Sequence, residues 1–180
     1  MTHFPFEALS RRLPRLVCLI ANLTAGALPL SVGAAPTADA RAFLVDLYRH
    51  YPTADTPGVF DPVGADAPKV FTPNLAGLIR QDQKYANGEV GALDGDPLCD
   101  CQDDGGLQAN VSAVRQTGPT SARAVVILTF TASSPPEVRR LVIRLSRVKG
   151  GWRIADIHSA SEASLRAYLA RSNRDHVVGR

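Results

Sequence analysis

The sequence predicts an α+β domain in which helices pack on a curved, cone-like antiparallel sheet of about four strands. Two observations lead to this prediction. Residues 37–88 place apolar side chains at helical spacing, whereas residues 107–159 show the β-branched and alternating patterns typical of strands. Helices followed by a run of strands are typical of α+β folds. The 180 residues suit one domain, residues 35–180 with a core over about 38–171, behind a leader.

The leader, residues 1–34, has the order of a secretory signal peptide. A basic stretch (11–15) precedes an apolar run (16–30), and Val32-Gly33-Ala34 supplies the small residues of a cleavage site. We therefore expect an exported, periplasmic protein that meets the membrane only through its leader before cleavage. A leader that stays uncleaved and anchors the chain in the membrane is the alternative.

The first helix is expected to end before Pro52. Apolar and aromatic side chains recur at helical spacing from Ala40 to Tyr51, and Thr37 or Asp39 is the expected N-cap. The face that carries this stripe should pack on the sheet.

A loop is expected over residues 52–70, which are rich in Pro, Gly and Asp. The next helix should start with Thr72 as N-cap and Pro73 at its first position, and Asn87-Gly88 should close it. Asp82 interrupts the apolar face of this helix.

Four strands are expected to follow, over residues 107–117, 122–132, 139–148 and 152–159. Residues 122–132 form a nearly continuous apolar run, which is typical of a central strand covered on both faces. In the third strand, Leu141, Ile143 and Leu145 alternate with polar residues. Gly150-Gly151 predicts a tight hairpin before the last strand.

The last strand should show one face that carries Trp152, Ile154, Asp156 and His158, because side chains alternate along a strand. A short C-terminal helix over residues 161–172, with Ser161 as its cap, should complete the domain and turn Leu165, Tyr168 and Leu169 inward.

Charge divides the mature chain into two halves. Residues 35–107 hold 5 basic and 12 acidic side chains, a net charge of −7, whereas residues 108–180 hold 12 basic and 4 acidic ones, a net charge of +8. The basic half has few aromatic residues among its arginines, with Trp152 as the one candidate nearby, whereas single-stranded nucleic acid is bound through stacking aromatics. We therefore expect no nucleic-acid partner.

The segment DGDPLCDCQDDGG, residues 94–106, contains the two cysteines of the mature chain. Cys99 and Cys101 are one residue apart, so they can form a disulfide in an oxidising compartment, remain two thiols, or bind a metal. The calcium-loop pattern fails, because Leu98 stands where a third oxygen ligand is needed, and a zinc site lacks clear partners. We expect no metal. The aspartates and glycines fit an ordered turn, and Gln102 and Asp103 are placed to tie it to the sheet.

Five segments occur in an order that resembles a known family: RAFLVDLYRHY, FTPNLAGLI, LDGDPLCDCQD, GGWRIADI and SLRAYL. They are similar to the exported bacterial family of domain of unknown function 3828, which looks like a variant of the nuclear-transport-factor-2-like, or cystatin-like, fold. The resemblance covers about residues 38–171, and its most specific motif runs from Asp96 through Asp103. It implies a cone-shaped fold and no particular reaction, because this fold serves both enzymes and binding modules.

Candidate catalytic residues are few. One hypothesis is that Asp156 and His158 point into an apolar pocket. An aspartate in such a pocket can act as a general acid or base, and Tyr48 or Tyr51 on the covering helix could then polarise a carbonyl group. Alternatively, Asp156 pairs with a neighbouring arginine and His158 lies in water. The sequence holds no Ser/His/Asp order, phosphate loop or zinc motif, and we expect no cofactor.

The functional prediction is an exported, non-catalytic binding module. Its partner is an unknown protein, for example the target of an immunity or inhibitor protein, or an apolar small molecule. A small acid–base enzyme of the isomerase or dehydratase type that uses Asp156 is the alternative.

Overall fold

The computed structural model describes residues 36–51, 60–103 and 106–178. The predicted leader and Pro52 lie outside these residues. The helices and strands follow one another as α1 (Pro36–Tyr48), α2 (Ala67–Val70), α3 (Pro73–Ala86), β1 (Leu107–Gly118), β2 (Ser121–Phe130), β3 (Glu137–Val148), β4 (Gly151–His158) and α4 (Leu165–Val178). None of the helices in these segments is long and apolar enough to span a bilayer.

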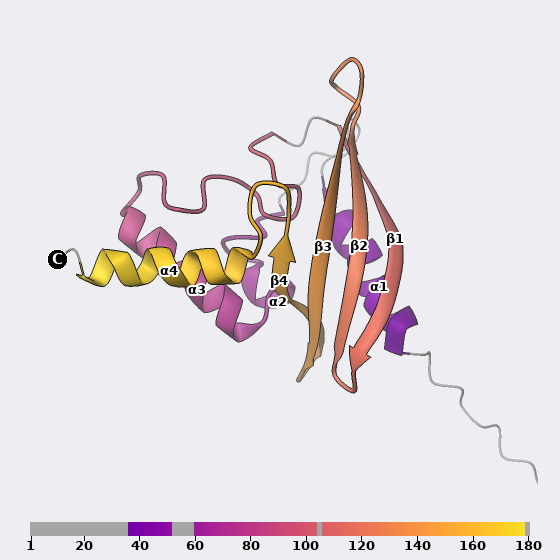
Figure 1. The fold of residues 1–180 in the computed structure, drawn as a ribbon, viewed down its shortest axis with the longest axis horizontal. Helices are drawn as coiled ribbons and strands as arrows, with labels where there is room; N and C mark the ends of the chain where they lie inside the picture. The colour runs from indigo at the N-terminus through magenta and orange to yellow at the C-terminus, as the bar shows by residue number, and fades with distance from the viewer. Residues whose placement is uncertain (1–35, 52–59, 104–105, 179–180) are drawn as a thin grey trace, which may run out of the picture. The chain divides into compact units, whose positions relative to one another are not determined.

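The four strands form one open antiparallel sheet in the order β1-β2-β3-β4 (Figure 1). The α+β prediction is therefore confirmed. Each strand pairs with its neighbour along the chain, so short turns suffice to connect them. At the last turn, Gly150 and Gly151 have φ angles of 97° and 120°, which side chains of L-residues rarely tolerate.

The hydrophobic core lies on one face of this sheet. Helix α1 packs mainly against β1, whereas α3 and α4 pack against each other and against β4 (Figure 1). On β2, five alternating side chains are buried: Ala122, Ala124, Val126, Leu128 and Phe130. The intervening side chains are partly or fully exposed. The prediction that both faces of this strand are covered is therefore wrong for the described residues.

Helix α3 has the predicted ends. The Thr72 Oγ1 accepts a hydrogen bond of 3.5 Å from the Leu75 N–H, Pro73 is the first helical residue, and Asn87 takes the left-handed conformation with φ of 52°. A helix end leaves backbone groups without partners inside the helix. Thr72 accepts from one such N–H group, Pro73 has no N–H group, and the Asn87 N–H donates to the Gln83 carbonyl oxygen.

The boundaries of α1 differ from the prediction. The helix begins at Pro36, so Thr37 and Asp39 lie in its first turn and not at the cap. Asp39 is stabilised there by the partial positive charge of the helix N-terminus and lies 3.6 Å from the Arg147 guanidinium. The helix ends at Tyr48, and a turn carries the chain on to Tyr51.

Helix α4 starts later than predicted. Ser164 is its N-cap, because its Oγ accepts a hydrogen bond of 3.2 Å from the Ala167 N–H. Ser161, the predicted cap, instead donates a hydrogen bond to Asp100. The helix extends to Val178, so it is longer than the predicted segment 161–172.

The last strand contains a β-bulge that the sequence pattern does not reveal. Leu145 pairs with Ile154, whereas the preceding residue of β3, Arg144, pairs with Asp156, so Ala155 is an extra residue on β4. A bulge shifts the alternation of side chains by one residue. Even-numbered residues of β4 therefore face the core before Ala155, and odd-numbered residues face it afterwards.

This bulge overturns the prediction that four residues of β4 share one face. Trp152 and Ile154 lie on the core face, and Ile157 rejoins them after the bulge. Asp156 and His158 lie on the other face.

Candidate functional site

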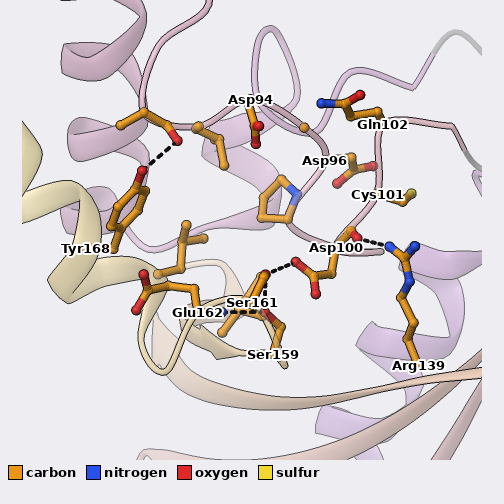
Figure 2. Close-up of a pocket in the computed structure, with 16 residues that line it drawn as sticks. Asp94, Asp96, Asp100, Cys101, Gln102, Arg139, Ser159, Ser161, Glu162 and Tyr168 are labelled. Carbon is orange, nitrogen blue, oxygen red and sulfur yellow. Dashed lines mark hydrogen bonds between the residues drawn. The ribbon is translucent and has the colours of Figure 1, made fainter.

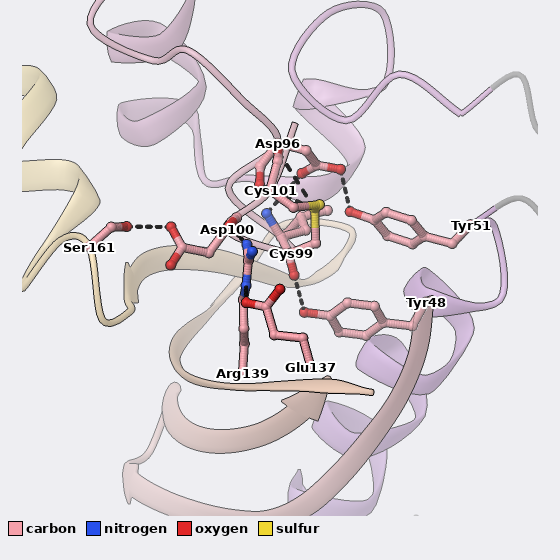
Figure 3. The surroundings of a disulfide bond; sticks show 10 residues. Tyr48, Tyr51, Asp96, Cys99, Asp100, Cys101, Glu137, Arg139 and Ser161 are labelled. Atoms are coloured by element: carbon pink, nitrogen blue, oxygen red, sulfur yellow. Dashed lines mark hydrogen bonds and ion pairs between the residues drawn. A yellow bond between two sulfur atoms is a disulfide. The ribbon is translucent and has the colours of Figure 1, made fainter. Parts of the chain in front are cut away.

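Residues 94–103, which we name the Asp-Cys loop, form a tight turn closed by a disulfide between Cys99 and Cys101 (Figure 3). The Asp96 N–H donates a hydrogen bond of 2.8 Å to the Cys101 carbonyl oxygen, and the Asp96 Oδ1 accepts one of 2.8 Å from the Leu98 N–H. A Cβ at Gly95 would lie 2.6 Å from the Cys101 carbonyl oxygen, so this position needs glycine. The loop thus has a defined conformation built largely from its own backbone.

Two tyrosines bind this loop on one side: Tyr48 is the last residue of α1, and Tyr51 lies in the turn that follows (Figure 3). The Tyr48 hydroxyl donates a hydrogen bond of 2.8 Å to the Leu98 carbonyl oxygen, and the Tyr51 hydroxyl donates one to the Asp96 Oδ2. The two rings stack with their centroids 5.7 Å apart. Burial raises the pKa of the Tyr48 phenol, and the negative charge of Asp96 raises it further, so Tyr48 remains a donor.

Residues of β3 and of the segment before α4 fasten the other side of the loop (Figure 3). The Arg139 Nη1 donates to the Asp100 carbonyl oxygen, and its Nε donates a hydrogen bond of 2.6 Å to Glu137. This bond to Glu137 raises the pKa of Arg139. The Asp100 carboxylate accepts a hydrogen bond from Ser161. Asp100 has a φ of 56°, a left-handed conformation that aspartate tolerates better than most residues.

A cavity of about 620 Å³ opens beside the Asp-Cys loop (Figure 2). It is lined by Ala92, Leu93, Asp94, Gly95, Asp96, Pro97, Asp100, Cys101, Gln102, Arg139, Ile157, Ser159, Ser161, Glu162, Leu165 and Tyr168. Its volume falls within the usual range of about 300–1,000 Å³ for small-molecule sites. We name this cavity the loop pocket.

A buried aspartate outside the pocket shapes one of its walls. The carboxylate of Asp82, only 1% exposed, accepts hydrogen bonds of 3.0 Å each from the N–H groups of Ala92 and Leu93. The Tyr168 hydroxyl donates a hydrogen bond of 3.1 Å to the Ala92 carbonyl oxygen. Sequence reasoning missed this role of Asp82, although a charged residue on an apolar helix face was its signal.

Asp156 serves the first turn of α4. It is 3% exposed, and its carboxylate accepts hydrogen bonds from the N–H groups of Ile157 and Arg166 at 3.0 Å and from the Ser164 hydroxyl at 2.8 Å. A carboxylate at a helix N-terminus is favourable because it meets unpaired N–H groups and the positive end of the helix dipole. The carboxylate of Asp156 therefore binds the N-terminus of α4 and not the side chain of a neighbouring arginine, the partner that one of the two alternatives predicted.

The candidate catalytic residues form two separate pairs, Asp156 with His158 and Tyr48 with Tyr51. Asp156 lines a separate groove with Arg144 and Arg166, whereas Tyr48 and Tyr51 bind the Asp-Cys loop. Half-buried His158 lies near Asp156, its Nε2 3.6 Å from the Asp156 Oδ2. It also forms a hydrogen bond with the Ala163 carbonyl oxygen.

The other predicted site residues divide between pocket and core. Gln102 lines the loop pocket, and Asp103 is exposed next to it. Trp152 is 4% exposed and packs in the core, with the Arg147 guanidinium 5.8 Å from its ring centroid. Among the described residues, no group of three or more His, Cys, Asp and Glu side chains is arranged to hold a metal ion.

Among curated proteins, the chain is distantly similar to a bacterial protein of greater length. The chain is 29% identical over 128 residues to an uncharacterized protein, YqhG, of Escherichia coli (strain K12). The aligned region covers 71% of this chain and 41% of YqhG, so the chain spans less than half the length of this relative. No family model matches the chain. Because YqhG is itself uncharacterized, the similarity assigns no function.

Proposed function

We propose that the protein is an exported, non-catalytic binding module whose loop pocket takes a small molecule with an apolar body. The observation that carries this proposal is the way in which the pocket wall is held. The Asp-Cys loop is fastened by Tyr48 and Tyr51 from one side and by Arg139 and Ser161 from the other. A wall that is already ordered loses little conformational entropy when a ligand binds.

Three of the four carboxylates that line the pocket, all but that of exposed Asp94, accept hydrogen bonds from other groups of the protein, which supports a ligand that is mainly apolar. Asp96 accepts from Tyr51, Asp100 accepts from Ser161, and Glu162 accepts a hydrogen bond of 3.2 Å from the Ser164 N–H. These carboxylates thus have partners within the protein.

The apolar lining is available for contact. Half-buried Leu93 and Tyr168 supply most of this accessible apolar surface, because Ile157 and Leu165 are only 2% and 6% exposed. These side chains offer van der Waals contact in a pocket whose polar rim fixes orientation, as in most small-molecule sites.

The geometry gives less support to an acid–base enzyme. A general base must come within hydrogen-bond distance of the proton that it removes. Asp156 does not line the loop pocket, and both of its carboxylate oxygens already accept hydrogen bonds from the start of α4.

Export is the second part of the proposal. The order of basic, apolar and small residues in 1–34 supports cleavage near Ala34 and a periplasmic mature protein that begins near Ala35. N-terminal sequencing of the protein from producing cells tests this. A chain that still begins at Met1 or Thr2 would overturn cleavage and favour a membrane anchor.

We also propose that the chain is a relative of the domain of unknown function 3828 family with a nuclear-transport-factor-2-like fold. The five shared segments and their order support this relationship. An experimental structure compared with members of that fold would test it, and a different strand order in those members would contradict it.

Native mass spectrometry of the exported protein, isolated without denaturation, tests the pocket. We expect a small-molecule adduct on the wild type that is absent from Ala92→Trp, because a bulky ring at this lining position fills the cavity. Val90→Trp is the matched control, since Val90 is 77% exposed and does not line the pocket. An adduct missing from the wild type, or retained equally by both variants, would contradict the proposal.

A further inference from the structure

Four arginines lie on the face of the sheet opposite the core. Arg115 of β1 pairs with Arg123 of β2, and Arg123 pairs with Arg144 of β3, so three arginines lie side by side across three strands. Arg140, four residues before Arg144 on β3, shares their face and is also exposed. We name these four residues, with the side chains between them, the arginine face.

This arrangement is unfavourable in the isolated protein. Neighbouring strands are about 4.8 Å apart, and like charges placed directly opposite each other across a sheet are destabilising. Among the described residues, none of the four guanidinium groups forms an ion pair. An anionic partner would relieve the repulsion between them.

Strands β1, β2 and β3 contribute no acidic residue to this face. The residues of β1, β2 and β3 on this face are Gln108, Asn110, Ala113, Arg115, Ser121, Arg123, Val125, Ile127, Thr129, Val138, Arg140, Val142, Arg144 and Ser146. No Asp or Glu is among them, so these strands contribute four positive charges and no negative charge. The carboxylate that β4 places there, Asp156 opposite Arg144, accepts hydrogen bonds from Ile157, Ser164 and Arg166.

An apolar row adjoins the arginine row. Ala113 pairs with Val125, and Val125 pairs with Val142, one step along the strands from the three arginines. Val125 and, two residues further on β2, Ile127 are partly exposed, whereas Val142 is 6% exposed and already covered. A β-branched run such as that of β2 is typical of strands covered on both faces, yet the described residues cover only one. Apolar side chains with arginine around them are typical of protein–protein interfaces.

We propose that the arginine face docks a carboxylate-rich surface of a partner protein. This inference goes beyond the loop pocket, because the sheet residues that line the pocket, Arg139 and Ile157, belong to the core face. A second copy bound symmetrically through the same face would place arginine against arginine, which disfavours a homodimer here. The face offers no Trp, Phe or Leu to insert into a lipid surface and no aromatic ring to stack on bases.

Fluorescence anisotropy with a labelled ten-glutamate peptide as the probe tests this proposal. We expect binding to the wild type that weakens with salt, and a loss of affinity of about tenfold or more in Arg123→Gln/Arg144→Gln. Arg171→Gln/Arg174→Gln is the matched control, since it removes the same charge from exposed positions of α4. This control should stay within about twofold of the wild type.

Unfolding without the probe supplies a second measurement. Arg123→Gln/Arg144→Gln should melt at or above the wild-type temperature, because a like-charge repulsion is removed, and this also shows that the variant is folded. A clear fall in melting temperature would contradict the repulsion on which the proposal rests.

Three other results would overturn the proposal. The first is no binding of the peptide to the wild type, and the second is an equal loss in both double variants, which indicates net charge alone. The third is tighter binding of vesicles with anionic phospholipid, or of duplex DNA, with the same dependence on Arg123 and Arg144. Ala92→Trp should bind the peptide like the wild type, so failure of the pocket proposal and failure of this one are distinguishable.

Discussion

The Tyr48 hydroxyl donates a hydrogen bond of 2.8 Å to the carbonyl oxygen of Leu98, fifty residues further along the chain. This bond joins α1, which packs on the sheet, to the Asp-Cys loop. Leu98 is fully buried, so its carbonyl group depends on a protein partner. The wall of the loop pocket is therefore supported by the position of α1.

Replacing Tyr48 by Phe should lower the free energy of unfolding by about 1–3 kcal/mol, because a buried carbonyl group loses its donor. Chemical unfolding of the two proteins at neutral pH measures this difference. Tyr85→Phe, at a half-buried position on α3 where the hydroxyl accepts a bond from exposed Gln81, should change stability by less than about 0.5 kcal/mol. Equal effects of the two substitutions would contradict the structural role of Tyr48.

The effect of Tyr48→Phe should also depend on pH. Burial and the charge of Asp96 raise the pKa of Tyr48 above its ordinary value of 10.0. The folded protein thus holds this proton more tightly than the unfolded chain does. The resulting stabilisation is complete below pH 10 and is lost as the pH rises above it. The stability gap between wild type and Tyr48→Phe should therefore narrow as the pH rises from about 10 to about 11, and a constant gap would argue against a buried phenol.

Asp82→Ala should destabilise the protein by about 2 kcal/mol, because it leaves the N–H groups of Ala92 and Leu93 without their acceptor. Hydrogen exchange of these two amides should become faster than in the wild type. Asp94→Ala, an exposed position in the same region, should leave both properties nearly unchanged. Unaltered exchange at Ala92 and Leu93 in the Asp82 variant would show that this carboxylate does not order the pocket wall.

Asp156→Ala should lower stability by about 1–3 kcal/mol and increase hydrogen exchange in the first turn of α4, because the Arg166 N–H and the Ser164 hydroxyl lose their acceptor. Asp175→Ala, at an exposed position near the end of the same helix, is the control and should have little effect. Thermal unfolding measures both variants. An Asp156 variant as stable as the wild type would refute capping and revive the acid–base alternative.

Replacing Cys99 and Cys101 together by serine should leave the fold intact. The disulfide closes a very short loop, so it removes little entropy from the unfolded chain, and its contribution should fall near the low end of the range of about 0–5 kcal/mol. Thermal unfolding of the double variant and of the wild type, each with and without a chelator, measures this. A collapsed double variant, or a wild type destabilised by the chelator, would indicate a redox or metal role.

Much of the fold could be predicted from the sequence, because local patterns distinguish the helical spacing of apolar side chains from the alternation of a strand and also mark the ends of helices. The alternation of Leu141, Ile143 and Leu145 marks the buried face of β3, and Thr72 with Asn87 marks both ends of α3. Such signals act over a few residues, where the backbone's own hydrogen bonds and the burial of one face decide the conformation.

The site was less predictable, because its parts meet only through distant contacts. The alternating pattern of β4 gives no sign of the extra residue Ala155, which turns Asp156 away from the face of Ile154. In the sequence, Tyr48 is one of several apolar and aromatic residues at helical spacing. That pattern does not show that its hydroxyl donates a hydrogen bond to Leu98 in the Asp-Cys loop.

The sequence by itself determined the turn chemistry of the Asp-Cys loop and the types and order of all elements except α2 (Ala67–Val70), a short helix inside the predicted loop 52–70. These features depend on neighbouring residues. Only the tertiary structure decided that Asp82 supports a pocket wall, that Asp156 serves α4, and that arginines from three strands share one row. The physical reason is that strand register and the partners of buried polar groups depend on residues far apart in the chain. The short-range pattern of side chains does not contain that information.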